Sequence, residues 1–268
     1  MLLGVKSLMI KTYVITLSTE QARNRHIRAE CDKYGLNPLL LEAVDLRQKS
    51  EEEVRQLSAL PSHKPKRKRR WLSKGVIGCA LSHQMAYQHI YNSNEKYALI
   101  LEDDAEFIAS PLEILDEAVL DSILIQYEFD VLLIGYVKKK QQELKDYFDC
   151  VPIKKRAEIT LSDSKLQFGT PWAQYASGTV AYIVTKRGAE KLMAANAVPC
   201  VTADDYLYFE QFYGVRVLHC RPTFVLESDE FKSTLGNDRV KKKKFGHLFV
   251  RIVKGRLKNF AMNYVGLK

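Results

Sequence analysis

The 268-residue sequence predicts an α/β fold in which helices flank a central, mostly parallel sheet. The pattern from residue 12 to residue 45 is strand–helix–strand, which implies a right-handed crossover between parallel strands. Short apolar runs that suit buried strands recur at 98–101, 130–135 and 177–184, between stretches of helical composition. Acidic residues follow several strands, and open α/β sheets bind ligands outside the carboxyl ends of their strands. The sequence therefore predicts a fold class and the sheet edge that binds a ligand.

Composition and cysteine content indicate an ordinary globular protein. Hydrophobic residues make up 46% of the chain and charged residues 27%, as in typical soluble domains. The five cysteines include no C-x-x-C pair, which argues against a disulfide framework and a zinc cluster. No uncharged apolar run reaches about 18 residues, and residues 1–10 lack the basic segment and cleavage site of a signal peptide. We expect a cytoplasmic protein without a membrane-spanning segment.

The positive charge is concentrated in two segments. The formal net charge is +9, and residues 239–268 contain ten Lys or Arg residues and no acid, so the rest of the chain sums to −1. Residues 64–74 carry seven further bases and no acid. Basic segments can bind nucleic acid through phosphate contacts, but the sequence shows no recognised nucleic-acid module, and the acids at the sheet edge would repel a phosphate backbone. We expect a mildly acidic body with two basic appendages and no nucleic-acid partner.

The N-terminal strand–helix–strand unit places polar residues at two strand ends. Residues 12–17 are β-branched and apolar, and residues 18–20 offer N-cap chemistry for a helix over 21–34. A second strand over 39–45 ends in an acid. The residues expected at these ligand-facing ends are Thr16, Ser18, Ala43 and Asp45.

A glycine-containing segment precedes the next long helix. Residues 50–60 are a polar helical segment, and residues 61–70 form a basic, proline-containing loop. Gly75 and Gly78 then lead into a helix that ends at Asn92. Glycines before a helix suit the approach of a phosphate to backbone N–H groups, although a tight packing turn would leave the same pattern. Two residues of this helix could contact a ligand, although a helical histidine is more often structural: Ser82 and His83.

The strongest chemical signal is an acidic triplet after a buried strand. The apolar run 98–101 ends in Glu102, Asp103 and Asp104. Three acids cannot all face an apolar core, because an unpaired buried charge is costly. A divalent cation shared with substrate phosphates would supply the opposite charge. The alternative is a solvated acidic turn near the start of a helix.

The second half of the chain carries another acid pair. Its predicted elements are strands over 130–135 and 177–184, a polar segment of strands and loops over 138–170, a helix over 187–195 and a strand over 215–219. Asp204 and Asp205 head an aromatic-rich helix, and either acid could be its N-cap.

Five motifs occur in a fixed order along the chain. They are V-I-T-L with a following R-x-R, G-x-x-G-C-x-L-S-H, L-E-D-D-A, S-G-T-x-A-Y-I, and the acid pair before Tyr206-Leu207. In this order and spacing, the stretch from about Ile10 to Leu235 resembles the glycosyltransferase family 25 enzymes of bacterial lipooligosaccharide synthesis. The resemblance implies a GT-A fold over 9–238. It also implies an inverting transfer of a hexose, most often β-linked galactose from UDP-galactose, with Mn²⁺ or Mg²⁺.

The resemblance assigns the triplet to the donor diphosphate. Asp104 is expected to coordinate the metal directly, and Glu102 to assist through metal-bound water or the ribose. Many GT-A enzymes have Asp at the position of Glu102, which leaves the division of roles open. His219, after a late strand, is the expected third ligand. The residues expected to bind the donor are Thr16, Ser18, Arg25, Ala43, Asp45, Gly75, Ser82, Glu102, Asp103, Gly178 and Thr179.

An inverting transfer needs a general base that removes the proton of the acceptor hydroxyl. A metal-bound carboxylate would be a poor base, because the cation lowers its basicity. The base is therefore expected to lie apart from the triplet, at the acid pair. Asp205 is the expected base, and Asp204 is expected to cap the helix or bind acceptor hydroxyls.

The basic C-terminal segment 239–268 predicts an amphipathic helix. Apolar residues from Phe245 to Val265 recur at helical spacing, and Lys241–Lys244 and later bases occupy other positions. Such helices lie in a membrane interface and attract anionic lipid, which would bring the enzyme to a lipid-linked acceptor at the inner face of the cell membrane. The alternative is a terminal helix that docks on the domain with its basic side in water.

The same sequence pattern is compatible with other functions. A UDP-glucose-dependent β-glucosyltransferase of the same pathway, a metal-dependent nucleotide-sugar hydrolase and an inactive binding protein would share much of this pattern. The sequence leaves the donor sugar, the acceptor and its linkage position undetermined, because sugar specificity depends on a few pocket contacts.

Overall fold

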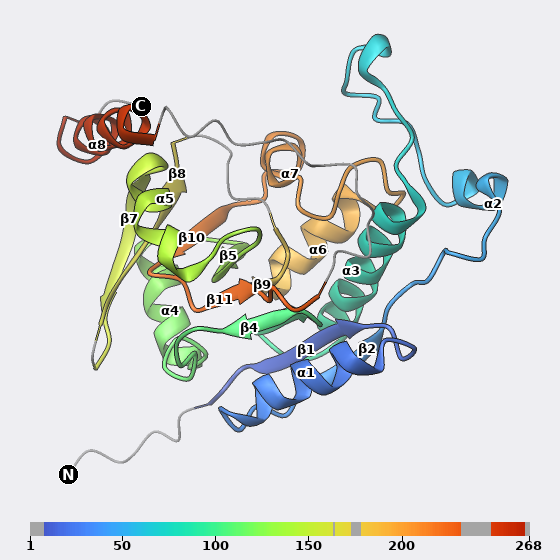
Figure 1. The fold of residues 1–268 in the computed structure, drawn as a ribbon, viewed down its shortest axis with the longest axis horizontal. Helices are drawn as coiled ribbons and strands as arrows, with labels where there is room; N and C mark the ends of the chain where they lie inside the picture. Colours follow the sequence, from blue (N-terminus) through green and yellow to red (C-terminus); the bar gives the residue numbers. More distant parts are fainter. Residues whose placement is uncertain (1–7, 163, 173–177, 232–247, 266–268) are drawn as a thin grey trace.

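The computed structural model describes residues 8–162, 164–172, 178–231 and 248–265, and its centre is an eight-stranded sheet with helices on both faces (Figure 1). The order of the strands is β2-β1-β3-β9-β5-β10-β8-β7. Their bounds are β1 Lys11–Thr16, β2 Leu39–Glu42, β3 Tyr97–Glu102, β5 Val131–Leu133, β7 Ile153–Thr160, β8 Lys165–Pro171, β9 Ala181–Thr185 and β10 Val217–Arg221. A smaller sheet has the order β4-β11-β6, with β4 Ala105–Phe107, β6 Gly135–Tyr136 and β11 Val225–Glu227.

The large sheet is mixed, which corrects the prediction of a mostly parallel sheet. The pairs β1–β2, β1–β3 and β5–β10 are parallel, whereas β3–β9, β5–β9, β8–β10 and β7–β8 are antiparallel. A short connection joins β7 to β8 and makes them a hairpin, and β9 enters between β3 and β5 from the opposite direction. Local apolar patterns identify strands but carry no information about the direction of a partner that is distant in sequence.

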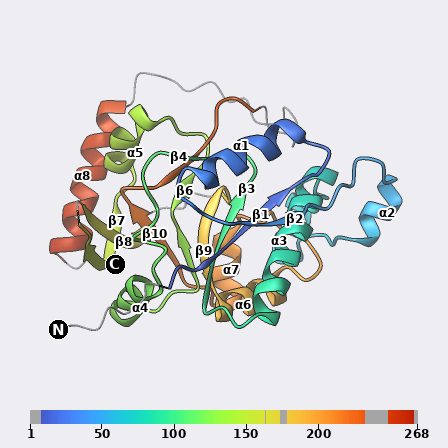
Figure 2. The ribbon, with the colours of Figure 1, turned by 90° about the horizontal axis from the view of Figure 1, so that it is seen from below.

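Helices cover the two faces of the sheet in separate groups. Their bounds are α1 Gln21–Asp32, α2 Glu51–Gln56, α3 Lys74–Asn92, α4 Glu117–Gln126, α5 Leu144–Cys150, α6 Lys186–Ala195, α7 Tyr206–Tyr213 and α8 Leu248–Tyr264, with 3-10 turns at Lys66–Lys68 and Gln141–Glu143. One hydrophobic core joins α1 and α4 to one face of the sheet. A second core joins α3, α6 and α7 to the other face. The result is a three-layer arrangement in which the carboxyl ends of β1, β2 and β3 meet at one edge (Figure 2).

Most predicted elements are present, with local differences at their ends. The second strand ends at Glu42, so Asp45 lies in the following loop. Helix α5 lies in the segment that was expected to hold only strands and loops, because a seven-residue helix with two buried apolar side chains leaves a weak periodic signal.

Helix α3 begins at Lys74, one residue before the first glycine of the G-x-x-G motif. Gly75 and Gly78 therefore lie within the helix rather than in a loop before it. A Cβ atom at Gly78 would lie 2.5 Å from the carbonyl oxygen of Val44. Gly78 is thus required for the close packing of α3 against the chain that follows β2. Of the two interpretations of the G-x-x-G motif, phosphate approach and tight packing, the second accounts for Gly78.

Helix α8 packs against α5 and β7, as both views of the ribbon show (Figures 1 and 2). Gly255 and Met262 are buried in this contact, and a Cβ atom at Gly255 would lie 1.8 Å from the carbonyl oxygen of Asp149. The Asn263 amide donates to the carbonyl oxygen of Ile153 at 3.0 Å, and its carbonyl accepts from the Lys155 N–H at 2.9 Å. The predicted boundary at residue 238 and the residues Lys241–Lys244 and Phe245 lie outside the described residues. Among the described helices, none is both long and apolar enough to cross a membrane.

Candidate functional site

A pocket of about 190 Å³ lies at the carboxyl ends of β1, β2 and β3, and we call it the strand-end pocket. The sequence-predicted residues that line it are Thr16, Ala43, Asp45, Gly75, Ser82, Glu102, Asp103 and Asp104. His83, which the sequence indicates as a possible ligand contact, also lines it. Polar or charged lining residues that the sequence did not assign to a site are Arg23, Arg47, Lys74, Cys79 and Glu227. The parallel pairing of β1 with both β2 and β3 brings their ends to one edge, as expected for ligand sites in α/β sheets.

Arg23 of α1 supplies a positive charge next to the acidic triplet. Its Nη1 lies 2.6 Å from Asp103 Oδ1 and 2.9 Å from Asp104 Oδ2. The guanidinium carbon lies 5.1 Å from the ring centre of Phe231. A buried arginine that bridges two carboxylates offsets their repulsion without a metal ion, so part of the counter-charge that the sequence attributed to a cation comes from the protein.

The helical spacing of α1 could have identified Arg23. Arg23, Ile27 and Cys31 recur at intervals of four and are all buried. Arg25 of the same R-x-R motif is exposed and does not line the pocket. Arg23 and Arg25 belong to one R-x-R motif, but the direction of each side chain follows from the period of the helix.

Asp104 has one carboxylate oxygen without a partner. Its Oδ2 accepts from Arg23, whereas its Oδ1 is buried and has no hydrogen-bond partner. Burial, followed by the charge of Glu102, raises the pKa of Asp104 to about 7. Buried polar atoms are rarely left unsatisfied in folded proteins. The Oδ1 atom is therefore suited to an oxygen-preferring cation such as Mn²⁺ or Mg²⁺.

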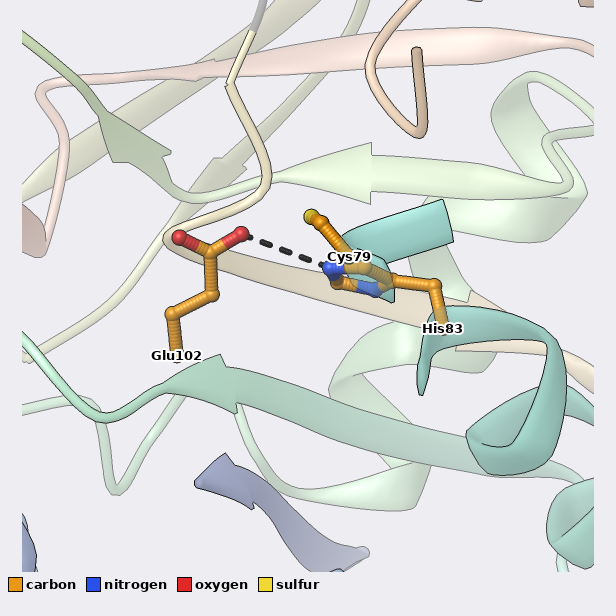
Figure 3. Close-up of side chains that lie close together, drawn as sticks. All are labelled: Cys79, His83 and Glu102. Carbon is orange, nitrogen blue, oxygen red and sulfur yellow. Dashed lines mark hydrogen bonds and ion pairs between the residues drawn. The ribbon is translucent and has the colours of Figure 1, made fainter. Parts of the chain in front are cut away.

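Glu102 is held by a chain of hydrogen bonds that joins β3 to α3 and β9. Its Oε1 accepts from the hydroxyl of Thr179, and His83 Nε2 lies 3.3 Å away (Figure 3). His83 Nδ1 lies 2.7 Å from the hydroxyl of Tyr182, which lies 2.9 Å from that of Tyr87. Burial alone would raise the pKa of Glu102, but the bonds and charge of His83 and the bond from Thr179 hold it below its usual value. The carboxylate is thus kept ionised and oriented.

Cys79, His83 and Glu102 form a second group with metal-binding side chains. One ligand atom from each lies within 4.8 Å of the others, and Figure 3 shows the sulfur and the imidazole on the same side of the carboxylate. Thiolate and imidazole suit softer ions such as Zn²⁺. Burial and the charges of Glu102, Asp204 and Asp104 raise the pKa of Cys79 well above its ordinary value. Hard cations such as Mn²⁺ and Mg²⁺ prefer oxygen ligands, and both imidazole nitrogens of His83 are already in hydrogen bonds, so the oxygens of Glu102 and Asp104 are the better ligands for a hard cation.

Several predicted donor-binding residues support the pocket instead of lining it. The Ser18 N–H donates to Glu42 Oε1 at 3.0 Å. Gly178, at φ +146°, packs against Val137. Thr179 contacts the site through its bond to Glu102.

Two pocket-lining residues have structural bonds of their own. The Ser82 hydroxyl accepts from the Val44 N–H at 2.8 Å and donates to the carbonyl oxygen of Gly78 at 2.7 Å, which ties α3 to the loop after β2. Asp45 accepts two bonds from the Arg47 guanidinium at 2.9 and 2.7 Å, and these bonds lower the pKa of Asp45.

His219 does not meet the triplet. It lies on β10, three strands from β3 in the order β3-β9-β5-β10, and so roughly 14 Å from the strand that carries Glu102. It is buried beside Tyr136, and burial and the charge of Arg221 lower the pKa of His219 to about 3. The structure brings His83 to Glu102, and His219 serves the core.

The acid pair lies before α7, and the cap is Asp205 rather than Asp204. The Asp205 side chain accepts from the Tyr208 N–H at 3.3 Å, which makes Asp205, and not Asp204, the N-cap of α7. Asp204 is half-buried, and its charge contributes to the raised pKa of both Cys79 and Tyr206. Asp204 is therefore close enough to act electrostatically on Cys79 of the strand-end pocket, yet its carboxylate does not line that pocket.

Known proteins with similar sequences share one enzymatic family. The profile of glycosyltransferase family 25 (LPS biosynthesis protein) matches residues 9–207. A Haemophilus influenzae protein provisionally named a glycosyltransferase is 30% identical over 242 residues, which are 85% of this chain and 77% of that protein. The human protein named procollagen galactosyltransferase 2 is 24% identical over 193 residues, which are 69% of this chain but 27% of that protein.

A solved structure also resembles the chain at low similarity. The crystal structure of a glycosyltransferase involved in the glycosylation of the major capsid of PBCV-1 covers 93% of this chain and 100% of that chain, with 10% identity and a TM-score of 0.40. This likeness is too distant to support an argument about the site. The sequence match over residues 9–207 contains the elements that build the strand-end pocket, from β1 to β3, and the acid pair. On this match, the chain belongs to glycosyltransferase family 25 and is a glycosyltransferase.

Proposed function

We propose that this glycosyltransferase transfers galactose from UDP-galactose, with inversion and with a divalent cation, to a saccharide acceptor of lipooligosaccharide or lipopolysaccharide. The observation that carries the proposal is the buried, unpartnered Oδ1 of Asp104 beside an ionised Glu102 at the carboxyl edge of the sheet. Galactose is supported by the name of the human relative, procollagen galactosyltransferase 2. We assign the domain to the GT-A group because its strand-end site combines acidic residues with the start of a helix.

The diphosphate of the donor would lie between the triplet and the start of α3. Lys74 and Gly75, at the N-terminus of this helix, line the pocket. The positive end of a helix dipole and its first N–H groups favour phosphate oxygens. Asp104 and Glu102 would hold Mn²⁺ or Mg²⁺, which supplies charge stabilisation to the departing UDP. Arg23 holds two of the three acids in place, and His83 and Thr179 orient Glu102.

Asp204 is the proposed general base. An inverting transfer requires a carboxylate that takes the proton of the acceptor hydroxyl from the face opposite the leaving group. Asp205 is engaged in capping α7 and is therefore assigned the positioning role. Because Asp204 does not line the pocket of the triplet, it would not coordinate a cation bound there and would keep more of its basicity than a metal-bound carboxylate.

A donor screen tests the proposed reaction. UDP-galactose, UDP-glucose and other UDP-sugars are incubated with the full chain, with and without Mn²⁺, and with a lactose-type or lipooligosaccharide core acceptor. We expect Mn²⁺-dependent, acceptor-dependent transfer with UDP-galactose. Preference for UDP-glucose would replace the donor assignment, and release of UDP that does not depend on the acceptor would identify a nucleotide-sugar hydrolase.

Helix α8 supports a peripheral membrane contact. Its buried face packs on α5 and β7, yet a second apolar stripe is exposed: Phe249 is 77% exposed, Leu257 66%, Phe260 60% and Tyr264 78%. The neighbouring positions carry bases at Arg251, Lys254, Arg256 and Lys258. An apolar stripe bordered by bases favours the interface of an anionic bilayer, and this would hold the enzyme at the cytoplasmic face of the inner membrane beside a lipid-linked acceptor.

Vesicle flotation of the full chain tests this contact. Leu257→Glu and Phe260→Glu place charges in the exposed stripe without entering the buried face of α8, and we expect them to abolish flotation with anionic vesicles. Glu113→Gln, a surface change outside α8, serves as the control. Undiminished flotation of both stripe variants would rule out α8 as the membrane contact.

A further inference from the structure

A second cavity lies between α8 and the β7–β8 hairpin, apart from the strand-end pocket. Its volume is about 630 Å³, within the usual range of about 300–1,000 Å³ for small-ligand sites. We call it the α8 cavity. It shares no lining residue with the strand-end pocket. Four of its lining residues are bases and one is an acid: Lys155, Lys165, Arg221 and Arg256, with Asp149.

Arg221, at the end of β10, is a buried cation whose N–H groups are incompletely satisfied. The residue is 9% exposed, and its Nε and Nη2 have no hydrogen-bond partner. Its Nη1 donates weakly, at 3.4 Å, to the carbonyl oxygen of Phe148, and its guanidinium carbon lies 4.5 Å from the ring centre of Phe148. Arginine stays charged in proteins, and a buried charge without a counter-ion is costly. Among the described residues no acid pairs with Arg221, whose polar neighbour is Tyr136, so the buried charge favours an anionic ligand.

The acids near the α8 cavity already have cationic partners. Asp149 pairs with Arg256 of α8 at 2.7 Å. Glu158 pairs with Lys155 at 2.8 Å and with Lys165 at 2.6 Å. Rotation of either acid toward Arg221 would break an existing pair. The nearby acids are therefore not available to neutralise Arg221. The lining keeps an excess of positive charge, which favours an anionic ligand.

We propose that the α8 cavity binds a phosphate group through the guanidinium of Arg221. The two unsatisfied N–H groups of Arg221 form the edge of the guanidinium fork that suits bidentate recognition of an oxyanion. A phosphate, with its higher charge, matches the excess of bases better than a single carboxylate does. The site does not depend on which sugar the enzyme transfers.

The bound phosphate can come from two sources with the same chemistry. Tyr264 both lines the α8 cavity and belongs to the exposed apolar stripe of α8. A lipid headgroup would therefore reach Arg221 from a bilayer in contact with that stripe. A phosphorylated saccharide would reach it from solution.

Thermal unfolding of the full chain in inorganic phosphate, against chloride at matched ionic strength, tests the site. We expect phosphate to raise the Tm of the wild-type protein, and Arg221→Met to weaken phosphate binding by about tenfold or more. Arg221→Met is expected to leave the Tm in chloride unchanged or higher, because it removes an unpaired buried charge. Arg216→Met, which removes the same charge just before the same strand, is expected to retain the phosphate response.

Two results would overturn the proposal: no phosphate response in the wild-type protein, or an equal response in wild type and Arg221→Met. If Arg221→Met does not fold, Arg221→Lys keeps the charge and removes the fork. That variant is also expected to bind phosphate about tenfold more weakly, and an unchanged affinity would count against the site.

Flotation with phosphatidic acid vesicles and titration with glucose 6-phosphate distinguish the two sources. A headgroup site predicts weaker flotation of Arg221→Met and competition by inorganic phosphate. A soluble source predicts equal flotation of both proteins and Arg221-dependent binding of the sugar phosphate. Either pattern supports the site, whereas binding of both probes independently of Arg221 rejects it.

Discussion

At the residue scale, the unpartnered Oδ1 of Asp104 couples cation binding to pH. The pKa of Asp104 is raised from 3.8 to about 7 by burial and by the charge of Glu102. Between these two values the folded protein holds a proton at Asp104 that the unfolded chain does not. The stability of the metal-free protein therefore falls as pH rises from 3.8 to about 7, and this contribution is constant above that range.

Proton release from Asp104 should appear directly in Mn²⁺ binding. We expect the apparent affinity of the full chain for Mn²⁺ in the presence of UDP to rise roughly tenfold per pH unit below about pH 7 and to level off above it. Titration calorimetry from pH 5 to pH 8 measures the slope. Asp104→Asn should bind Mn²⁺ weakly at every pH, and a wild-type affinity that is independent of pH would contradict the assignment of Asp104 as a ligand.

The acid pair allows a matched comparison of two neighbouring carboxylates. Asp204→Asn should lower the transfer rate by about 100-fold or more while UDP binding is retained. Asp205→Asn should keep the rate within a few fold, because Asn is also a good N-cap, whereas Asp205→Ala should lower the stability by about 1 kcal/mol. Single-turnover transfer and thermal unfolding provide the two measurements. A larger rate loss in Asp205→Asn than in Asp204→Asn would return the role of base to Asp205.

At the element scale, the docking of α8 depends on one glycine. A Cβ atom at Gly255 would lie 1.8 Å from the carbonyl oxygen of Asp149, which is backbone and cannot move aside easily. The helix approaches α5 through this position, and the exposed stripe faces away from it. Docking and exposure thus use different faces of one helix, so the two interpretations of the C-terminal segment are compatible.

Gly255→Ala should release α8 from the domain. We expect faster hydrogen exchange in α8 and loss of the phosphate response at the α8 cavity, with UDP binding unchanged because the strand-end pocket contains no residue of α8. Lys254→Ala, at the exposed neighbouring position, is the control and should behave as wild type. Unchanged exchange in Gly255→Ala would show that α5 can shift to accept the methyl group.

At the scale of the whole molecule, the two pockets lie on different parts of one sheet. The strand-end pocket uses β1, β3 and the loop after β2, whereas the α8 cavity uses β7, β8 and β10 at the other side. They share no lining residue. Ligands at distant sites without shared partners act on stability independently.

Stabilisation by the two ligands should therefore add. The increase in unfolding free energy with UDP and Mn²⁺ together with phosphate should equal the sum of the separate increases, within about 0.5 kcal/mol. Chemical denaturation in the four ligand conditions measures this. A combined increase well below the sum would indicate that phosphate and UDP compete for one pocket.

The sequence by itself determined the elements and the ligand edge of this protein. Buried strands are short apolar runs, and Thr16, Asp45 and the triplet after Leu101 come directly at or after such runs. Since parallel strands end at one edge, local patterns were sufficient to place most of the strand-end pocket. The motif order was also sufficient to identify the family, which the match over residues 9–207 confirms.

Tertiary structure alone decided strand direction, the partners of buried charges and the faces of the helices. No local pattern reports that β9 runs antiparallel between β3 and β5, that Arg23 meets Asp103 across 80 residues, or that Arg221 is buried without an acidic partner among the described residues. Each of these depends on contacts between segments distant in the chain. Electrostatic and packing energies act through space, so residues such as Arg23 and His83 acquire their roles only when the fold brings them to the triplet.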